Sequence, residues 1–118
     1  MQITVTGKQL AVGEALRNRI EEHLRGAVEK YFDHAVEAHV VVSRVAHNVR
    51  VDITAQAARR ILVQAHGEAP DPYVAFDLAA DRIAKRLRRT KRQRVKERRG
   101  GADPATGRPR RTNSADNE

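Results

Sequence analysis

The sequence predicts an α+β fold: a single β-α-β-β-β-α domain in which two helices pack on one face of a four-stranded sheet. Two changes in the period of the apolar residues carry this prediction. Alternation of apolar and polar residues gives way to helical spacing near residue 13, and helical spacing returns near residue 71 after three extended runs. The chain of 118 residues is long enough for one such domain with one core.

The first strand and the first helix are predicted from this change of period. Ile3 and Val5 alternate with polar residues until Gly7, as in a half-buried strand that ends at a turn. Over residues 13–32 an apolar stripe at helical spacing predicts a helix; its members are Leu16, Ile20, Leu24, Ala27 and Tyr31. Because a helix joins the first two strands, they should pair in parallel with a right-handed crossover.

Three further strands are expected over residues 36–45, 49–57 and 60–67. In the last two runs apolar residues alternate with polar ones, which gives one apolar and one polar face. Residues 46–48 and 58–59 are short enough to be hairpin connections, so the three strands should form an antiparallel meander. The apolar face should carry both helices.

The second helix has a clear start signal. Asp71 can accept hydrogen bonds from the first free amides, Pro72 suits the first helical position, and Pro70 disfavours an earlier turn. An apolar stripe follows, made of Phe76, Ala80, Ile83 and Leu87. Beyond Thr90 this stripe is almost lost, so continuation of the helix to residue 99 would depend on propensity instead of packing.

The positive charge of the chain is concentrated in this second helix. Residues 82–99 hold eleven Lys or Arg residues against one acid, whereas residues 1–81 hold nine basic and eleven acidic residues. Within the helix the basic residues form two adjacent rows: Arg82, Arg86 and Arg89, and Lys85, Arg88 and Arg92. Like charges on one segment repel one another unless a polyanion neutralises them, and each neutralised phosphate releases counterions. Nucleic acid is therefore the predicted partner.

Other function classes find little support. The five histidines lack metal-ligand spacing, no cysteine is present, and neither a Gly-rich phosphate loop nor a nucleophile elbow occurs. We therefore expect no enzyme, cofactor or metal. The aromatic residues fall in the predicted helices, where core packing is expected in place of base stacking: Tyr31, Phe32, Tyr73 and Phe76. No run approaches the roughly 20 apolar residues of a membrane span, so a cytoplasmic protein is expected. No membrane partner is expected, because the small apolar face of the second helix is needed to cover the sheet.

Several short motifs occur in an order and at spacings that are specific when taken together. They are residues 1–7 (MQITVTG), 14–17 (EALR), 31–33 (YFD), 40–42 (VVV), 67–68 (GE), 71–77 (DPYVAFD) and 81–87 (DRIAKRL). Over residues 1–92 the sequence resembles the ribosome hibernation promoting factor family, also called the ribosome-associated inhibitor or sigma-54 modulation family.

The resemblance implies a domain that binds the small ribosomal subunit between head and body. There it would occupy the path of messenger RNA and the anticodon ends of transfer RNA, inhibit translation and keep the ribosome in hibernation, with no small-molecule substrate. It also implies that basic residues of the second helix face ribosomal RNA, here Arg82, Lys85, Arg86, Arg89, Lys91 and Arg92, with Lys8 as a further candidate. Arg88 joins these RNA-binding candidates because it lies on the same basic surface.

Two alternatives stay open. A general RNA-binding module resembling a double-stranded RNA-binding domain should have a Lys-rich start to its second helix, whereas this helix begins Asp71-Pro72-Tyr73. A small hydrolase is the other alternative, and no motif supports it.

The organisation of the chain follows from composition and from the resemblance. Residues 1–99 are expected to form the ribosome-binding domain. Residues 100–118 contain no hydrophobe larger than Ala and are expected to be a disordered tail or an interdomain linker. Long-form members of the family continue into a second domain that pairs ribosomes, so this chain is either a short form or part of a long form. We expect the isolated domain to be monomeric, with dimerisation only through such a missing domain.

Overall fold

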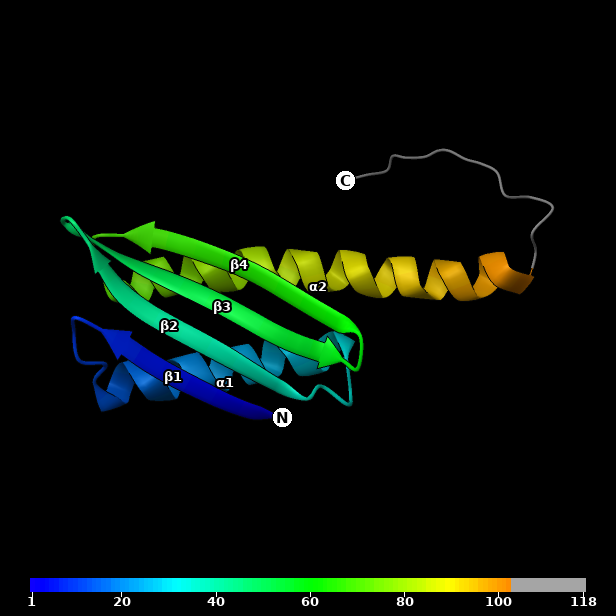
Figure 1. Cartoon of the computed structure of the whole chain (residues 1–118), viewed down its shortest axis with the longest axis horizontal. Helices are drawn as coiled ribbons and strands as arrows, with labels where there is room; N and C mark the ends of the chain where they lie inside the picture. Colours follow the sequence, from blue (N-terminus) through cyan, green and yellow to red (C-terminus); the bar gives the residue numbers. More distant parts are fainter. Residues whose placement is uncertain (103–118) are drawn as a thin grey trace. The chain divides into compact units, whose positions relative to one another are not determined.

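The computed structural model describes residues 1–102, with side chains described through residue 93, and it confirms the predicted order of elements (Figure 1). The elements are β1 (Gln2–Lys8), α1 (Glu14–Tyr31), β2 (Glu37–Val45), β3 (Asn48–Ala58), β4 (Ile61–Ala69) and α2 (Pro72–Ala102). Met1–Arg88 form one compact unit, and a second unit begins at Arg89 within α2. Residues 103–118, most of the expected tail or linker, lie outside the described residues.

The sheet has the order β1-β2-β3-β4, so β1 and β4 are its two edges. β1 pairs in parallel with β2, as the helical crossover predicts, with Val5 opposite Val40. β2 with β3 and β3 with β4 pair antiparallel, which confirms the meander. The turns are residues 46–47 and 59–60. β3 has a bulge between Gln56 and Ala58 and ends one residue beyond its predicted end.

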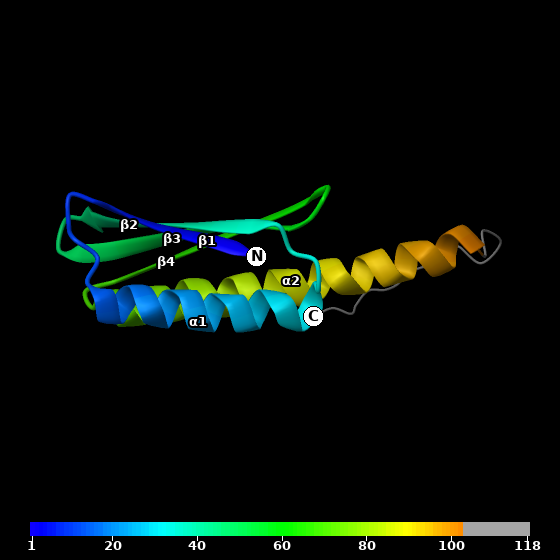
Figure 2. The same ribbon diagram turned by 90° about the horizontal axis from the view of Figure 1, so that it is seen from below.

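The core lies between the sheet and the two helices, which cover the same face of the sheet in the first unit (Figure 2). Strand residues at alternate positions are buried, among them Val40, Val51 and Ile53. The predicted stripe of α2 is buried completely, as Phe76, Ala80, Ile83 and Leu87. On the opposite face the alternate strand residues are mostly polar, although the exposed Leu62 and Val45 lie among them. Among the described residues no polar or charged side chain is buried.

The predicted stripe of α1 is wrong at its C-terminal end. Leu16, Ile20 and Leu24 are buried as expected, but the next buried residue is Val28, while Ala27 and Tyr31 are half-buried. The buried side chains therefore follow a row of four-residue steps. Such a row is inclined to the helix axis, so the line of contact with the sheet moves round α1 toward its end.

Helix α2 starts as its sequence predicts and packs tightly on β4. The Asp71 side chain accepts a hydrogen bond from the Tyr73 N–H at 2.7 Å, which caps the helix. One turn further along, the backbone of α2 lies directly on Gly67. A Cβ at Gly67 would lie 2.5 Å from the Ala75 carbonyl oxygen and 2.6 Å from the Ala79 nitrogen. A glycine is therefore required where strand and helix backbones meet.

Candidate nucleic-acid interface

The basic residues of α2 in the first unit lie on the side of the helix that faces solvent. Ile83 and Leu87 are fully buried against the sheet. The basic positions between and beside them are exposed, namely Arg82, Lys85, Arg86 and Arg88. Burial of the apolar stripe thus fixes the orientation of α2, and this orientation directs the predicted basic surface outward.

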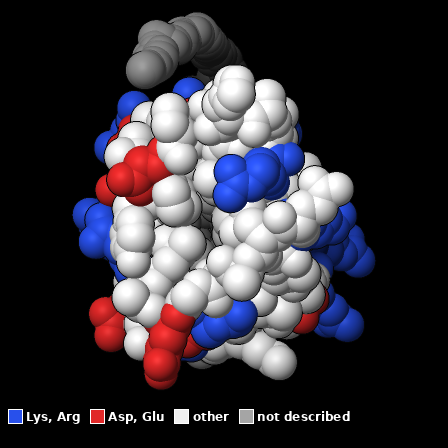
Figure 3. Space-filling model, turned by 90° about the vertical axis from the view of Figure 1, so that its left-hand side faces the viewer, with Lys and Arg blue, Asp and Glu red and all other residues white. Residues whose placement is uncertain are grey.

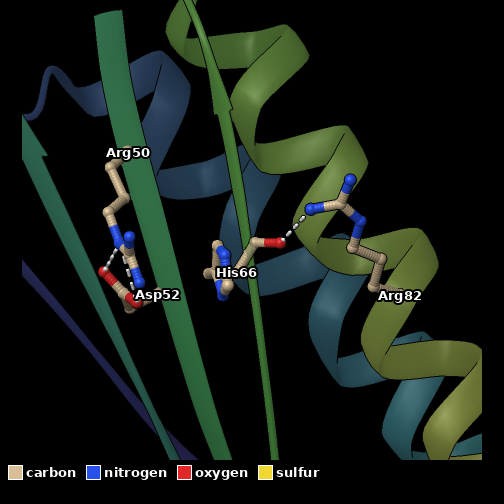
Figure 4. A network of polar contacts seen from close by, with 4 residues as sticks. All are labelled: Arg50, Asp52, His66 and Arg82. Carbon is tan, nitrogen blue, oxygen red and sulfur yellow. Dashed lines mark hydrogen bonds and ion pairs between the residues drawn. The ribbon is translucent and has the colours of Figure 1, made fainter. Parts of the chain in front are cut away.

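Arg82 and Arg86 make contacts that the sequence did not predict. The Arg82 guanidinium donates a hydrogen bond to the His66 carbonyl oxygen at 2.8 Å, and Arg86 donates one to the Gln64 carbonyl oxygen at 2.6 Å. Both acceptors belong to β4, the edge strand beside α2. Figure 4 shows the contact between Arg82 and His66. A guanidinium has five N–H donors, so each arginine still has donors that a phosphate can use.

Lys85 and Arg88 are less constrained than these two arginines. Lys85 lies 3.3 Å from the Asp81 carboxylate one helical turn earlier, and both side chains are more than half exposed. An exposed pair of this kind contributes only about 0.3 to 0.5 kcal/mol, so a stronger anion can displace it. Arg88 makes no hydrogen bond or ion pair with any other residue that the structure describes.

The second unit continues the basic helix. α2 extends past Thr90 to Ala102, so the helix reaches three residues beyond the predicted limit at residue 99. Arg89, Lys91 and Arg92 are exposed on this part of the helix. The side chains of the remaining basic residues of the segment lie outside the described residues.

Lys8 is not brought together with the basic residues of α2. It ends β1, the edge strand on the far side of the sheet from β4, opposite Ser43 of β2. Its position in the alternation of β1 places it on the polar face of the sheet, whereas α2 covers the other face. Lys8 therefore does not extend the surface of α2.

The polar face of the sheet differs in charge from α2. On this face Arg50 contacts the Asp52 carboxylate at 3.0 Å, and this hydrogen bond, with the attraction of the Asp52 charge, raises the pKa of the Arg50 guanidinium. Nearby, Asn48 donates to Glu68 at 3.0 Å. The end of the domain seen in Figure 3 likewise intersperses basic and acidic side chains. Among the described residues, the concentration of positive charge is thus found on α2.

The strands carry no Phe, Tyr or Trp, which bears on how a nucleic acid could be bound. Phe76 is buried in α2, and Phe32 is buried at the residue that follows α1. Tyr31 is half-buried, and Tyr73 is 39% exposed, so core packing is confirmed for the two phenylalanines but not for Tyr73. Bases therefore have no Phe, Tyr or Trp platform on this sheet.

The described residues contain no group of acidic, His or Cys side chains arranged to hold a metal ion. Among the helices of this part of the chain, none is long and apolar enough to cross a membrane.

Comparison with known proteins defines the class to which this domain and its basic helix belong. Residues 3–95 match the family described as "Sigma 54 modulation protein / S30EA ribosomal protein". The match covers most of the chain, and the chain belongs to this family.

The curated relatives carry one functional name. A ribosome hibernation promotion factor of Rhizobium meliloti is 39% identical over 93 residues, which cover 79% of this chain and 49% of the relative. A ribosome hibernation promoting factor of Azotobacter vinelandii is 31% identical over 105 residues, which cover 89% of this chain and 95% of that protein. The chain thus spans about half the length of the Rhizobium protein and nearly all of the Azotobacter protein.

Solved structures agree with this family and with its fold. The N-terminal domain of Protein Y from Thermus thermophilus matches with a TM-score of 0.68 and 29% identity, over 76% of this chain and 99% of that one. A ribosomal subunit interface protein from Coxiella burnetii has the same fold, with a TM-score of 0.68 and 22% identity, over 77% of this chain and 98% of that one. The resemblance found in the sequence motifs is confirmed.

Proposed function

We propose that this chain is a ribosome hibernation factor that binds the small ribosomal subunit and inhibits translation by occupying the channel for messenger RNA and transfer RNA. One observation carries the proposal: α2 buries an apolar stripe and presents exposed Arg82, Lys85, Arg86 and Arg88 to solvent, with more exposed basic residues along the same helix. The names of its relatives support a partner on the ribosome, which is a dense source of phosphate.

Binding through this helix uses phosphates and shape instead of base identity. Guanidinium and ammonium groups neutralise phosphates whatever the sequence, while sequence reading needs side chains that reach base edges or stack on bases. The strands carry no Phe, Tyr or Trp for stacking. A folded domain that fits a fixed channel gains its specificity from the shape of that channel, and it inhibits by excluding the normal ligands without any chemical step.

Inhibition of this kind is reversible, because it rests on electrostatic contacts with phosphates. Each phosphate contact exchanges a bound counterion for a basic side chain, so affinity falls as the salt concentration rises. The contacts are numerous, separate and non-covalent. The ribosome can therefore resume translation when the domain dissociates, and the domain itself needs neither cofactor nor substrate.

Co-sedimentation with separated ribosomal subunits tests the proposal. The wild-type chain should pellet with small subunits and should lower protein synthesis in a purified translation system. The charge reversal Arg88→Glu should weaken both effects, because Arg88 is exposed and has no partner among the described residues. Arg44→Glu is the matched control, since Arg44 is also exposed but lies at the end of β2. Equal binding of an arbitrary RNA duplex, without inhibition of translation, would favour a general RNA-binding module.

A further inference from the structure

The outer edge of β4 is covered by side chains of α2. Arg82 and Arg86 bind the carbonyl oxygens of His66 and Gln64, at 2.8 Å and 2.6 Å. In Figure 4 the His66 carbonyl is directed away from β3 and toward Arg82. In an antiparallel pair, a residue whose carbonyl faces outward also directs its N–H outward. The two arginines therefore contact a row of main-chain groups that an additional strand could use.

The sequence of β4 itself does little to prevent such pairing. Natural edge strands are protected by lysine, by proline, by bulges or by short length. β4 has nine residues, ILVQAHGEA, with neither lysine nor proline, and Glu68 is its one acid. Leu62 on this strand is 60% exposed. Protection of this edge thus depends on groups from outside the strand.

The other edge of the sheet is covered in the same way. Arg17 of α1 donates to the Val5 carbonyl oxygen at 3.0 Å, and Arg25 of α1 donates to the Met1 carbonyl oxygen at 2.7 Å. β1 is the second edge strand. Each helix thus directs two arginines to carbonyl groups along the sheet edge beside it. Both acceptors of α2 lie in β4, and those of α1 are Val5 of β1 and Met1, the residue before β1. This repetition indicates a role in the sheet that is separate from the surface charge of α2.

We propose that Arg82 and Arg86 close a strand-pairing surface on β4, and that the partner they exclude is β4 of a second copy of this chain. Two copies of one strand in antiparallel alignment are self-complementary, so no other sequence is needed. The positive charges of the two arginines also repel the same pair on an approaching copy. This inference concerns the free protein and holds whether or not the chain binds ribosomes.

The first test measures the mass of the free protein across a range of concentrations. Arg82→Ala with Arg86→Ala should give a concentration-dependent species of about twice the monomer mass in analytical ultracentrifugation, where the wild type stays monomeric. Arg44→Ala with Arg88→Ala is the control. It removes the same charge from two exposed arginines that have no partner among the described residues, and it should stay monomeric.

The second test asks whether the association runs through β4. Gln64→Pro removes an outward N–H, and an edge strand tolerates proline at such a position. Added to the double alanine variant, it should restore the monomer. In the associated form without proline, the amides of Gln64 and His66 should gain protection from hydrogen exchange.

The outcomes separate clearly. A double alanine variant that is folded by circular dichroism and monomeric at the highest concentration overturns the proposal, as does an association that Gln64→Pro leaves intact. If the double variant does not fold, the single variants Arg82→Ala and Arg86→Ala replace it, with the same expected dimer and the same rescue. Loss of ribosome binding in any of these variants does not bear on this inference, because the mass is measured without ribosomes.

Discussion

The two helices perform the same structural task with different surfaces. α1 and α2 both bury an apolar stripe on the sheet, and each covers one sheet edge with two arginines. On α1 the remaining charges are balanced, with four acidic and four basic residues in Glu14–Tyr31. On α2 the described residues from Arg82 to residue 93 include seven basic residues and no acid. Because α1 meets the needs of the fold with balanced charge, the excess on α2 requires a separate explanation, for which we propose binding of a polyanion.

The largest difference between the two helices should be in the stability cost of a glycine substitution. Gly67 of β4 lies against α2, whereas Gly26 lies within α1. Gly67→Ala places a Cβ against the backbone of α2, within 2.6 Å of the Ala75 oxygen and the Ala79 nitrogen. Since neither backbone atom can move without moving the helix, the free energy of unfolding should fall by about 3 kcal/mol. Chemical denaturation measures this change.

Gly26→Ala in α1 is the control for the preceding substitution. A Cβ there meets no atom within 4 Å, and the position lies inside the helix. Alanine should therefore stabilise the protein by about 0.5 to 1 kcal/mol. Equal effects of the two substitutions would contradict the close packing of α2 on β4.

The next effect concerns binding. Lys85→Ala with Arg88→Ala should weaken association with small ribosomal subunits and make the logarithmic salt dependence shallower by about 1 for each phosphate that is no longer neutralised. Stability should change little, because these side chains are exposed. The measurement is the binding constant at several salt concentrations.

Lys30→Ala with Arg44→Ala removes the same charge from α1 and β2 and should leave the salt dependence unchanged. Lys30 lies in the last turn of α1 and Arg44 near the end of β2. If this control weakens binding as much as the substitutions in α2, net charge and not the surface of α2 governs the interaction.

The smallest effects should come from the helix starts. Asp71→Ala removes the side chain that accepts the Tyr73 N–H and should lower the free energy of unfolding by about 1 kcal/mol. The N-cap of α1 is Gly13, which has extended φ and ψ and no side-chain hydrogen bond. Gly13→Ser should gain a few tenths of a kcal/mol, about the usual difference between these caps. Thermal unfolding of the two variants measures the expected loss of stability in Asp71→Ala and the expected gain in Gly13→Ser. Stabilisation by Asp71→Ala would refute the capping role.

The sequence predicts the elements better than it predicts their contacts. Alternation in β3 and the Asp71 signal are local properties, so the strand and the start of α2 lie where expected. The predicted end of the α1 stripe was wrong because the angle between helix and sheet decides whether Val28 or Ala27 is buried. That angle is set by packing across the whole core.

The candidate site was predicted as a set of basic residues but not as an arrangement. Exposure of Lys85 and Arg88 follows from their spacing relative to Ile83 and Leu87. The contacts of Arg82 and Arg86 could not be predicted from the spacing of residues in the sequence. Their acceptors are main-chain carbonyl groups, which every residue has. Only the placement of α2 beside the sheet edge selects these acceptors.

The anchoring of Arg82 and Arg86 has a consequence for how the sequence can change. Exchange of lysine for arginine, or the reverse, at Lys85 or Arg88 would keep the charge that the surface presents. Within the described part of the chain, neither side chain forms a hydrogen bond or an ion pair with the sheet. Arg82 and Arg86 each serve a strand edge and a charged surface at once, and a single ammonium group has no planar fork with which to do both. Substitution at Lys85 or Arg88 can therefore tune the attraction of α2 for a polyanion without affecting the sheet. A substitution at Arg82 or Arg86 changes the protection of the strand edge and the surface charge together.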